Sequence, residues 1–281
     1  MIKTVNFLKD KASIISKIKN LDILDAGIDE DNDPYVTLKS GIRFHGIRPR
    51  AKDKKFYSLL LSSDIKKILP FECFLVAQDI IIRYVEGGLM YNGPKKNHIY
   101  SVKEGDTVAE MGAFMGYYSM KMSQVVGDSG TIIAIEPLPE SVRILKKNMN
   151  YNNFNNVKIV PKGVWSEKST ITFTKKENDN QSSSIVLTRD EEISYEVDVD
   201  SLDNILNELS IASCNQMIIQ LNGVEIEGLE GLSIFKPKHL AIAARYDREG
   251  VDTIQYISDL LKRRGYQVTV SEDKFVFGKL K

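Results

Sequence analysis

Glu110-Met111-Gly112-Ala113-Phe114-Met115-Gly116 is the stretch of sequence that decides the fold. The apolar run 106–109 before it predicts a buried strand, and the segment 117–126 after it has helical character. A strand, a glycine turn and a helix form the first unit of a nucleotide-binding α/β fold. Phe114 stands where the dinucleotide-binding pattern places a glycine. The turn therefore suits a nucleoside ligand without a pyrophosphate, such as S-adenosylmethionine, better than a nicotinamide dinucleotide.

A second acidic residue, Glu136, ends the next apolar run, 131–135, and Pro137 follows it. A carboxylate at this place can accept hydrogen bonds from both hydroxyls of a ribose. Because ligands of such sheets bind beyond the carboxyl ends of the strands, we expect Glu110 and Glu136 to face one crevice. Glu110 suits the ammonium of S-adenosylmethionine, and the N-terminus of the helix after it suits the carboxylate. An ordinary strand-to-helix turn, which also favours glycine, is the structural alternative.

Strands and helices alternate from about residue 100 onward. This alternation predicts crossover connections and a mostly parallel sheet with both faces covered. We expect helices at 116–126, 138–149, 201–209, 225–231 and 250–264, and strands at 106–111, 131–136, 157–160, 217–221, 240–244, 267–271 and 274–278. The predicted fold class is thus α/β, a Rossmann-like seven-stranded mostly parallel sheet with an antiparallel C-terminal hairpin.

The first hundred residues follow a different pattern and predict an N-terminal α+β extension. Apolar residues at helical spacing indicate a helix over 3–19, and two β-rich runs around a turn indicate a hairpin within 33–47. Two helices interrupted by Pro70 are expected over 57–86, and a polar, serine-rich loop over 177–184. We therefore divide the chain into residues 1–100, for substrate recognition or oligomerisation such as a homodimer, and a catalytic domain, 101–281.

The composition bounds the partners and the compartment. The chain has 281 residues and a formal net charge of zero, so no net field attracts it to nucleic acid or anionic lipid. Residues 1–100 alone hold 17 basic and 12 acidic side chains, an excess that an ordinary solvated surface explains. No run of 18 apolar residues and no signal peptide are present, so we expect no membrane association and a cytoplasmic location. Cys73 and Cys214 lack the spacing of a metal or disulfide site, and we expect both to be buried thiols and no bound metal.

Between Gly105 and Gly231 the chain resembles the FkbM-type S-adenosylmethionine-dependent methyltransferases, a class I family. The resemblance rests on a set of short motifs in order, each weak alone: Gly105-Asp106-Thr107-Val108, Glu110-x-Gly112-Ala113-x-x-Gly116-Tyr117-Tyr118, Glu136-Pro137-x-Pro139-Glu140, Leu145-Lys146-Lys147-Asn148, Asn152-Asn153-x-x-Asn156-Val157, Ser182-Ser183-Ser184, Val199-Asp200-Ser201-Leu202-Asp203-Asn204-Ile205-Leu206 and Gly223-Val224-Glu225-Ile226-Glu227-x-Leu229-x-Gly231. It leaves residues 1–85 uncovered.

The resemblance implies a bound S-adenosylmethionine and a methyl acceptor that is a small molecule or a sugar hydroxyl. It places the methionine part of the cofactor near the first glycine turn, the ribose at Glu136 and the adenine after the third strand. The cofactor-binding residues that it implies are Glu110, Gly112, Ala113, Gly116, Tyr117, Glu136, Pro137, Gly163, Val164, Trp165 and Gln220. Trp165 either walls the adenine or is a half-buried structural residue.

The chain departs from the family pattern at the end of the fourth strand. The usual aspartate is Gln220 and the usual glutamate is Asn222. An amide accepts a hydrogen bond but cannot take a proton at neutral pH. We therefore expect Gln220 to position the acceptor and another group to remove its proton, with three candidates that have ordinary capping or surface roles as alternatives: Glu225, Tyr246 and Asp247.

Two other functions are compatible with the sequence. The first is methylation of RNA or protein, with residues 1–100 as the recognition module and a basic cluster at its centre, Arg48, Arg50, Lys52, Lys54 and Lys55. The second is a non-catalytic binding subunit that has kept only the cofactor pocket, which the amides at 220 and 222 favour. The segment Arg245–Arg248 is either a clamp for an anionic acceptor or a solvated turn, and the three histidines are expected to be structural.

Overall fold

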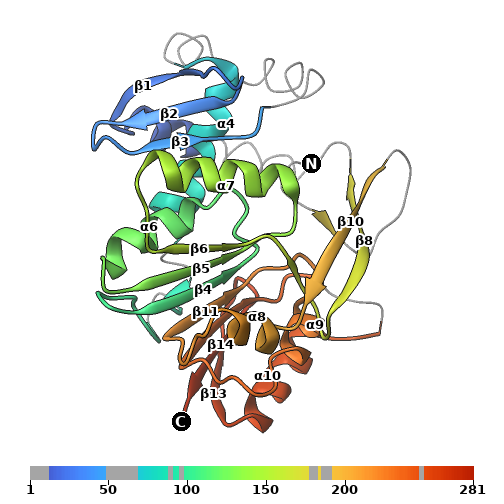
Figure 1. Ribbon diagram of the computed structural model, residues 1–281. Coiled ribbons are helices and arrows are strands. Elements are labelled where there is room, and N and C mark those ends of the chain that lie inside the picture. The colour runs from blue at the N-terminus through green and yellow to red at the C-terminus, as the bar shows by residue number, and fades with distance from the viewer. Residues whose placement is uncertain are drawn as a thin grey trace, which may run out of the picture.

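The structure is a computed structural model that describes residues 13–48, 69–87, 91–94, 98–176, 183–184, 192–246 and 250–281. A seven-stranded sheet forms its centre (Figure 1). Its strands, in spatial order, are β13 (Tyr266–Val270), β14 (Phe275–Leu280), β12 (His239–Ala243), β11 (Gln216–Ile219), β4 (Thr107–Met111), β5 (Thr131–Ile135) and β6 (Val157–Val160). The strand β14 runs antiparallel to both neighbours, and the other pairings are parallel. The predicted α/β class and all seven strands of this sheet are confirmed.

Side-chain alternation along the strands assigns the helices to the two faces of the sheet. Val108 belongs to the apolar cluster under α6 (Tyr117–Val126), whereas Ala109 and Met111 belong to the cluster of the opposite face. The helix α7 (Pro139–Tyr151) packs on the α6 side through a cluster that contains Ala134. The opposite face is covered by α8 (Leu202–Glu208), α9 (Glu225–Glu230) and α10 (Thr253–Arg263). Both faces are therefore buried, as parallel sheets require.

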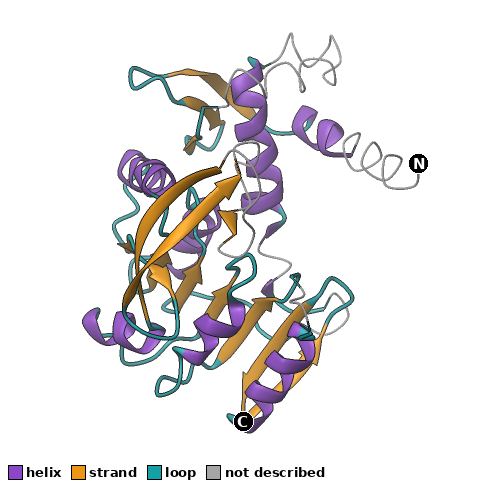
Figure 2. Ribbon diagram, turned by 90° about the vertical axis from the view of Figure 1, so that its right-hand side faces the viewer, coloured by secondary structure: helices purple, strands orange, loops and turns teal. Residues whose placement is uncertain are grey.

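The N-terminal extension forms a three-stranded sheet and a helical segment above α7 (Figure 1). The predicted hairpin is present as β2 (Pro34–Leu38) and β3 (Arg43–His45), and a strand that the sequence analysis missed, β1 (Ile23–Ile28), pairs with β2. The helix α4 (Phe71–Asp79) continues directly into a π-helix, η1 (Ile80–Val85), and the two run as one segment between this sheet and the rest of the molecule (Figure 2). The helix expected over 3–19 is described only from residue 13, and 57–68 lie outside the described residues.

The extension shares a hydrophobic core with the catalytic domain rather than standing apart from it. Phe44, Phe74 and Ile80 belong to one apolar cluster with Leu145 and Met149 of α7. A division of the chain near residue 100 remains a prediction, because the two parts bury each other's apolar surface. Cys73 lies in this cluster, and it and Cys214 are both buried and unpaired, as expected.

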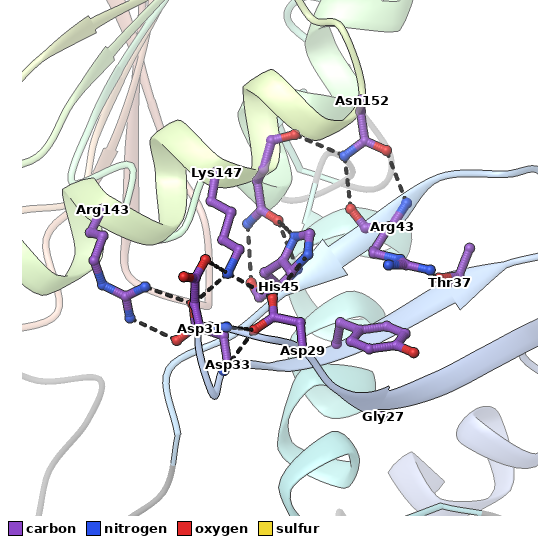
Figure 3. A network of polar contacts seen from close by, with 12 residues as sticks. Gly27, Asp29, Asp31, Asp33, Thr37, Arg43, His45, Arg143, Lys147 and Asn152 are labelled. Atoms are coloured by element: carbon purple, nitrogen blue, oxygen red, sulfur yellow. Dashed lines mark hydrogen bonds and ion pairs between the residues drawn. The ribbon is translucent and has the colours of Figure 1, made fainter.

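Polar contacts dock the extension on α7 as well (Figure 3). The Nζ atom of Lys147 lies 2.6, 2.7 and 2.8 Å from carboxylate oxygens of Asp29, Asp31 and Asp33 in the β1–β2 loop. Arg143 donates two hydrogen bonds to Asp33, at 2.6 and 2.7 Å. The ammonium of Lys147 therefore lies where three converging carboxylates would otherwise suit a metal ion.

A second, smaller sheet was not predicted. It has the order β7 (Gly163–Val164), β10 (Glu192–Asp200), β8 (Ser169–Lys176) and β9 (Ser183–Ser184), and its two long strands lie in front of the central sheet (Figure 2). The strands β8 and β10 pair antiparallel over eight residue pairs. Alternating β-branched residues in 169–174 were an available signal for this strand. Most of the predicted loop 177–184 lies outside the described residues.

Within the described part of the chain, no helix combines the length and apolarity needed to cross a bilayer.

Candidate functional site

Two adjoining cavities open at the carboxyl ends of the central strands. The first has a volume of about 80 Å³ and an apolar wall from β7, β8 and β10, and Glu136, Pro137, Gly163 and Val164 line it. The second is larger, about 320 Å³, and more polar, and Glu110, Ala113, Tyr118, Arg245 and Tyr246 line it. Four residues line both and so lie at the junction: Arg83, Gly112, Gln220 and Asn222. The two predicted acids thus lie in adjoining hollows that share a wall.

Gly112 is required by a close approach of two chains. Its φ angle is +82°, and a Cβ atom there would lie 2.2 Å from the carbonyl oxygen of Gln220. That oxygen belongs to the backbone after β11, which cannot move aside as a flexible side chain can. The amide groups of Gly112 and Ala113 both donate to the carbonyl oxygen of Ile135, at 3.0 Å each. The glycine turn is thereby fixed against the ends of both neighbouring strands.

Glu136 is buried and fixed by the backbone on both sides of it. Its carboxylate accepts a hydrogen bond from the amide of Phe114 at 2.9 Å and another from the amide of Leu138 at 3.1 Å. Phe114 has a φ of +52°, a conformation that non-glycine residues seldom adopt. The carboxylate therefore ties the glycine turn to the start of α7 and presents an anionic group at the first cavity.

Glu110 is 6% exposed and lies on the α6 side of β4. Its carboxylate accepts a hydrogen bond of 2.5 Å from the hydroxyl of Ser119. The pKa of Glu110 is raised to about 8, chiefly by burial and with a smaller contribution from the charge of Glu136, against the opposite effects of the Ser119 bond and the charge of Arg83. A carboxyl with this pKa is poised to ionise when a cation binds beside it.

The second cavity presents several hydrogen-bonding groups. Tyr91 donates a 2.9 Å hydrogen bond to the side-chain oxygen of Gln220. The hydroxyl of Tyr118, a residue that is 3% exposed, has no hydrogen-bond partner among the described residues. Arg245 lies with its guanidinium 5.0 Å from the centre of the Phe275 ring. Buried polar groups are nearly always satisfied, so an unpartnered hydroxyl beside the cavity is unusual, although this oxygen itself has almost no accessible surface.

Two predicted cofactor residues at the start of α6 line neither cavity. Gly116 has a φ of +78°, and a Cβ atom there would lie 2.2 Å from Leu145 and 2.7 Å from Met149. This glycine serves the turn and the packing of α6 against α7. Tyr117 is buried, and its hydroxyl donates to the carbonyl oxygen of His45 at 3.0 Å. Both residues thus have structural contacts away from the two cavities, and a carboxylate site at the N-terminus of α6 stays a prediction.

Two further predicted residues also have structural contacts. Trp165 is half-buried and packs on a small apolar cluster that includes Leu138 and Val199, and its amide donates to the carbonyl oxygen of Asp200 at 3.0 Å. It is absent from the lining of both cavities, which favours the structural alternative. Glu225 is buried, and its carboxylate accepts hydrogen bonds from the amides of Leu221 and Gly223 at 3.0–3.3 Å.

The three candidates for removing the acceptor's proton differ in where the structure places them. Glu225 holds the loop after β11, and burial raises its pKa. Tyr246 is 41% exposed and lines the second cavity beside Gln220. Asp247 lies outside the described residues, as does Arg248 of the proposed clamp. Tyr246 is therefore the described candidate that a ligand in the second cavity could reach.

Sequence reasoning missed several lining residues. Arg83 and Tyr91 come from the part of the chain before the family resemblance becomes strong, and Val197 and Val199 come from the unpredicted strand β10. Tyr118 lies in the quoted motif, but its place in the predicted helix does not distinguish a residue that lines a cavity from a residue of the core. The polar residues gave no local signal, because only the fold brings them to the strand ends.

The strand order defines the class of protein. In the central sheet the last strand, β14, lies antiparallel between the fifth, β12, and the sixth, β13, which gives the seven-stranded, mostly parallel sheet with a C-terminal antiparallel hairpin that the resemblance implied. The family model for the methyltransferase FkbM domain matches residues 106–268, more than half of the chain. The chain therefore belongs to the FkbM methyltransferase family.

Curated relatives match a short part of the chain. A protein-L-isoaspartate O-methyltransferase from Fervidobacterium nodosum is 42% identical over 59 residues, which cover 21% of this chain and 30% of that protein. Another from Methanococcus maripaludis is 39% identical over 57 residues, covering 20% and 27%. The matches span less than a third of these relatives' lengths.

Two solved structures are similar to this chain at low sequence identity. The methyltransferase FkbM from Methylobacillus flagellatus is 16% identical with a TM-score of 0.47, covering 73% of this chain and 53% of its own. The fibrillarin from Aeropyrum pernix, solved with S-adenosyl-L-methionine, is 10% identical with a TM-score of 0.45, covering 92% of this chain and 98% of its own.

Proposed function

We propose that this chain transfers a methyl group from S-adenosylmethionine to a hydroxyl oxygen of a small molecule. The observation that carries the proposal is the pair of adjoining cavities, one with Glu136 and one with Glu110, that meet at Gly112 and Gln220. In this proposal the first cavity takes the adenosine, and the second takes the amino-acid end and the acceptor.

The lining of the first cavity suits a nucleoside, and its volume of about 80 Å³ requires the cavity to widen as such a ligand binds. It is narrow, and its apolar wall contains Leu138, Val164, Val197 and Val199, which suits a flat base. A carboxylate can accept about four hydrogen bonds, so the two backbone bonds to Glu136 are compatible with binding of the ribose hydroxyls.

The second cavity fits a zwitterionic group beside a polar acceptor. Glu110 supplies a buried carboxyl for an ammonium, and Gln220 and Arg245 supply further polar groups in the lining. The cavity volume of about 320 Å³ lies at the lower end of the range for small-ligand sites, roughly 300–1,000 Å³. This size favours a small acceptor over a folded RNA or protein segment.

The chemistry divides between the cofactor and the chain. Bound S-adenosylmethionine supplies a methyl group that its sulfonium already activates for direct displacement. The chain has to hold the acceptor oxygen in line, and such positioning contributes on the order of 7–11 kcal/mol. Gln220 accepts from Tyr91 through its oxygen, which leaves its amide nitrogen to donate to the acceptor. Tyr246 is our candidate for removing the hydroxyl proton, and Asp247 remains a second candidate.

Calorimetric titration with S-adenosylmethionine and S-adenosylhomocysteine tests the cofactor. We expect Glu136→Ala to weaken binding by about 1.5–3 kcal/mol, the scale of a charged hydrogen bond, or roughly 10–150-fold in Kd. Glu104→Ala is the control, because Glu104 is exposed and lines neither cavity. No binding by the wild-type protein would refute the proposed function, and equal effects of the two variants would refute the ribose assignment.

Turnover tests the acceptor. A panel of small hydroxylated molecules and sugars, assayed for S-adenosylhomocysteine release, is expected to contain a substrate whose methylated oxygen can be identified by mass spectrometry. Turnover only with RNA, falling steeply with added salt, would instead favour the nucleic-acid alternative.

A further inference from the structure

The N-terminal extension contributes a cation to the junction of the two cavities. Among the described residues, the second cavity is lined by two cationic side chains, Arg83 and Arg245. Arg83 lies on η1 and lines both cavities, together with Gly112 and Gln220. Lys162, the other cation of the first cavity, is already paired with Asp200 and Glu208, at 3.2 and 2.8 Å. Arg83 is therefore the cation placed where a ligand must pass from one cavity to the other.

Arg83 is held in place by two contacts. Its Nε atom lies 3.3 Å from the carboxylate of Asp79, four residues earlier on the same helical segment. Its guanidinium lies over the ring of Phe114, 4.7 Å from the ring centre. The contact with Asp79 uses Nε, and in the described part of the chain no hydrogen bond from the two terminal nitrogens is found. A guanidinium fixed in this way presents a planar pair of donors that matches a carboxylate.

An acidic side chain lines the same cavity as Arg83. Glu110 lines the second cavity on the strand side, and the charge of Arg83 is close enough to lower the Glu110 pKa against the effect of burial. A buried carboxyl that ionises on binding and a cation in the same cavity are suited to the ammonium and carboxylate of an amino acid, because each ligand charge then replaces its lost water with an opposite charge. The helix start that was expected to bind the carboxylate does not line the cavity.

We propose that Arg83 binds the carboxylate of the cofactor's amino-acid end while Glu110 binds its ammonium. The proposal rests on the proposed function, since it assigns one end of the same ligand. It makes the N-terminal extension part of the cofactor site, although this extension lies outside the stretch that the family model matches. A π-helix at this place agrees with the tendency of such segments to occur at functional sites.

Two ligands that differ only in the amino-acid part test this assignment. S-adenosylhomocysteine carries the ammonium and carboxylate, whereas 5′-methylthioadenosine lacks both. We expect Arg83→Gln to weaken binding of S-adenosylhomocysteine by roughly 10–150-fold and to leave 5′-methylthioadenosine unchanged. Arg83→Lys, which keeps the charge but loses the planar fork, is expected to give a smaller loss. Arg263→Gln on α10, an exposed residue outside both cavities, is the matched control and is expected to change neither affinity.

The outcomes separate this inference from the proposed function. Unchanged S-adenosylhomocysteine affinity in Arg83→Gln, or an equal loss for both ligands, would overturn the assignment of Arg83 alone. Failure of the wild-type protein to bind either ligand would overturn the cofactor site and this inference with it. Thermal unfolding of each variant shows whether it is folded. If Arg83→Gln is unfolded, Arg83→Lys is compared with wild type instead, and a loss of affinity for S-adenosylhomocysteine but not for 5′-methylthioadenosine supports the assignment.

Discussion

The pH dependence of cofactor binding follows from the burial of Glu110. Burial raises the pKa of this carboxyl from 4.5 to about 8, so at pH 6 the protein without ligand holds it protonated. An ammonium requires the ionised form, and binding at pH 6 must therefore release a proton. Affinity for S-adenosylhomocysteine is expected to rise as the pH rises towards 8, by up to tenfold per pH unit.

The size of the effect can be worked out for a window in which the ligand keeps its charge. The ammonium of S-adenosylhomocysteine lies beside a free carboxylate, which raises its pKa above the value of about 7.7–8.0 for a chain terminus, so the ligand stays protonated up to pH 7.5. With the pKa of Glu110 at about 8, the affinity should increase roughly 75-fold from pH 5.5 to pH 7.5. Well above pH 8 Glu110 is already ionised in the protein without ligand, and the gain should end.

Calorimetry in two buffers of different ionisation enthalpy measures both the affinity and the protons released. We expect about one proton released per ligand bound at pH 6, and fewer at pH 8. Glu110→Gln should bind more weakly than wild type at pH 7.5 and show a flat profile, and 5′-methylthioadenosine should show a flat profile with the wild-type protein. A wild-type affinity for S-adenosylhomocysteine that does not change with pH, or the same pH profile for both ligands, would refute the reasoning.

Three substitutions elsewhere give distinct expected results. Gly116→Ala is expected to lower the free energy of unfolding by about 2–4 kcal/mol, from left-handed strain and overpacking against α7, and to leave cofactor affinity unchanged; denaturant titration and calorimetry test this, and lost affinity in a folded variant would contradict it. Lys147→Met is expected to cost about 2–4 kcal/mol, because it removes the cation beside Asp29 and Asp31 while Asp33 keeps its two hydrogen bonds from Arg143, with a smaller cost for Lys147→Arg in the same titration. Tyr246→Phe is expected to reduce turnover by roughly 10²–10⁴-fold at unchanged cofactor affinity, and full turnover would remove Tyr246 as the base.

The positions of the two acids could be predicted because strand ends are visible in the sequence. Glu110 and Glu136 each close an apolar run, and parallel pairing of β4 with β5 puts such ends at one edge. Glycine is harder to interpret, because it serves both ligand approach and chain packing. Gly112 and Gly116 have the same residue type and similar φ angles, yet one faces the backbone of Gln220 and the other the side chains of α7.

Contacts between distant parts of the chain could not be predicted. Glu225 follows a strand end as a catalytic carboxylate would, but its side chain turns back to the amides of its own loop. Arg83 precedes the glycine turn by almost thirty residues, and no local pattern shows that η1 lies against Phe114. Part of the apolar wall of the first cavity comes from β8 and β10, which pair with each other. The sequence between these two strands has no helix or strand signal, so their pairing could not be predicted.

The docking of the extension and the cofactor site are linked by the same geometry. Asn148 of α7 accepts from the amide of His45 at 2.7 Å and donates to the carbonyl oxygen of Met115 at 2.9 Å, so one side chain joins β3 to the glycine turn. The Lys147 contacts hold the adjacent loop of the same small sheet, and that sheet packs on α4, which continues into η1. The position of Arg83 therefore depends on contacts made by the opposite face of the extension. If Arg83 binds the cofactor carboxylate, the extension contributes to the affinity for the amino-acid end together with Glu110 of β4, while Glu136 and the apolar wall of the smaller sheet determine the affinity for the adenosine.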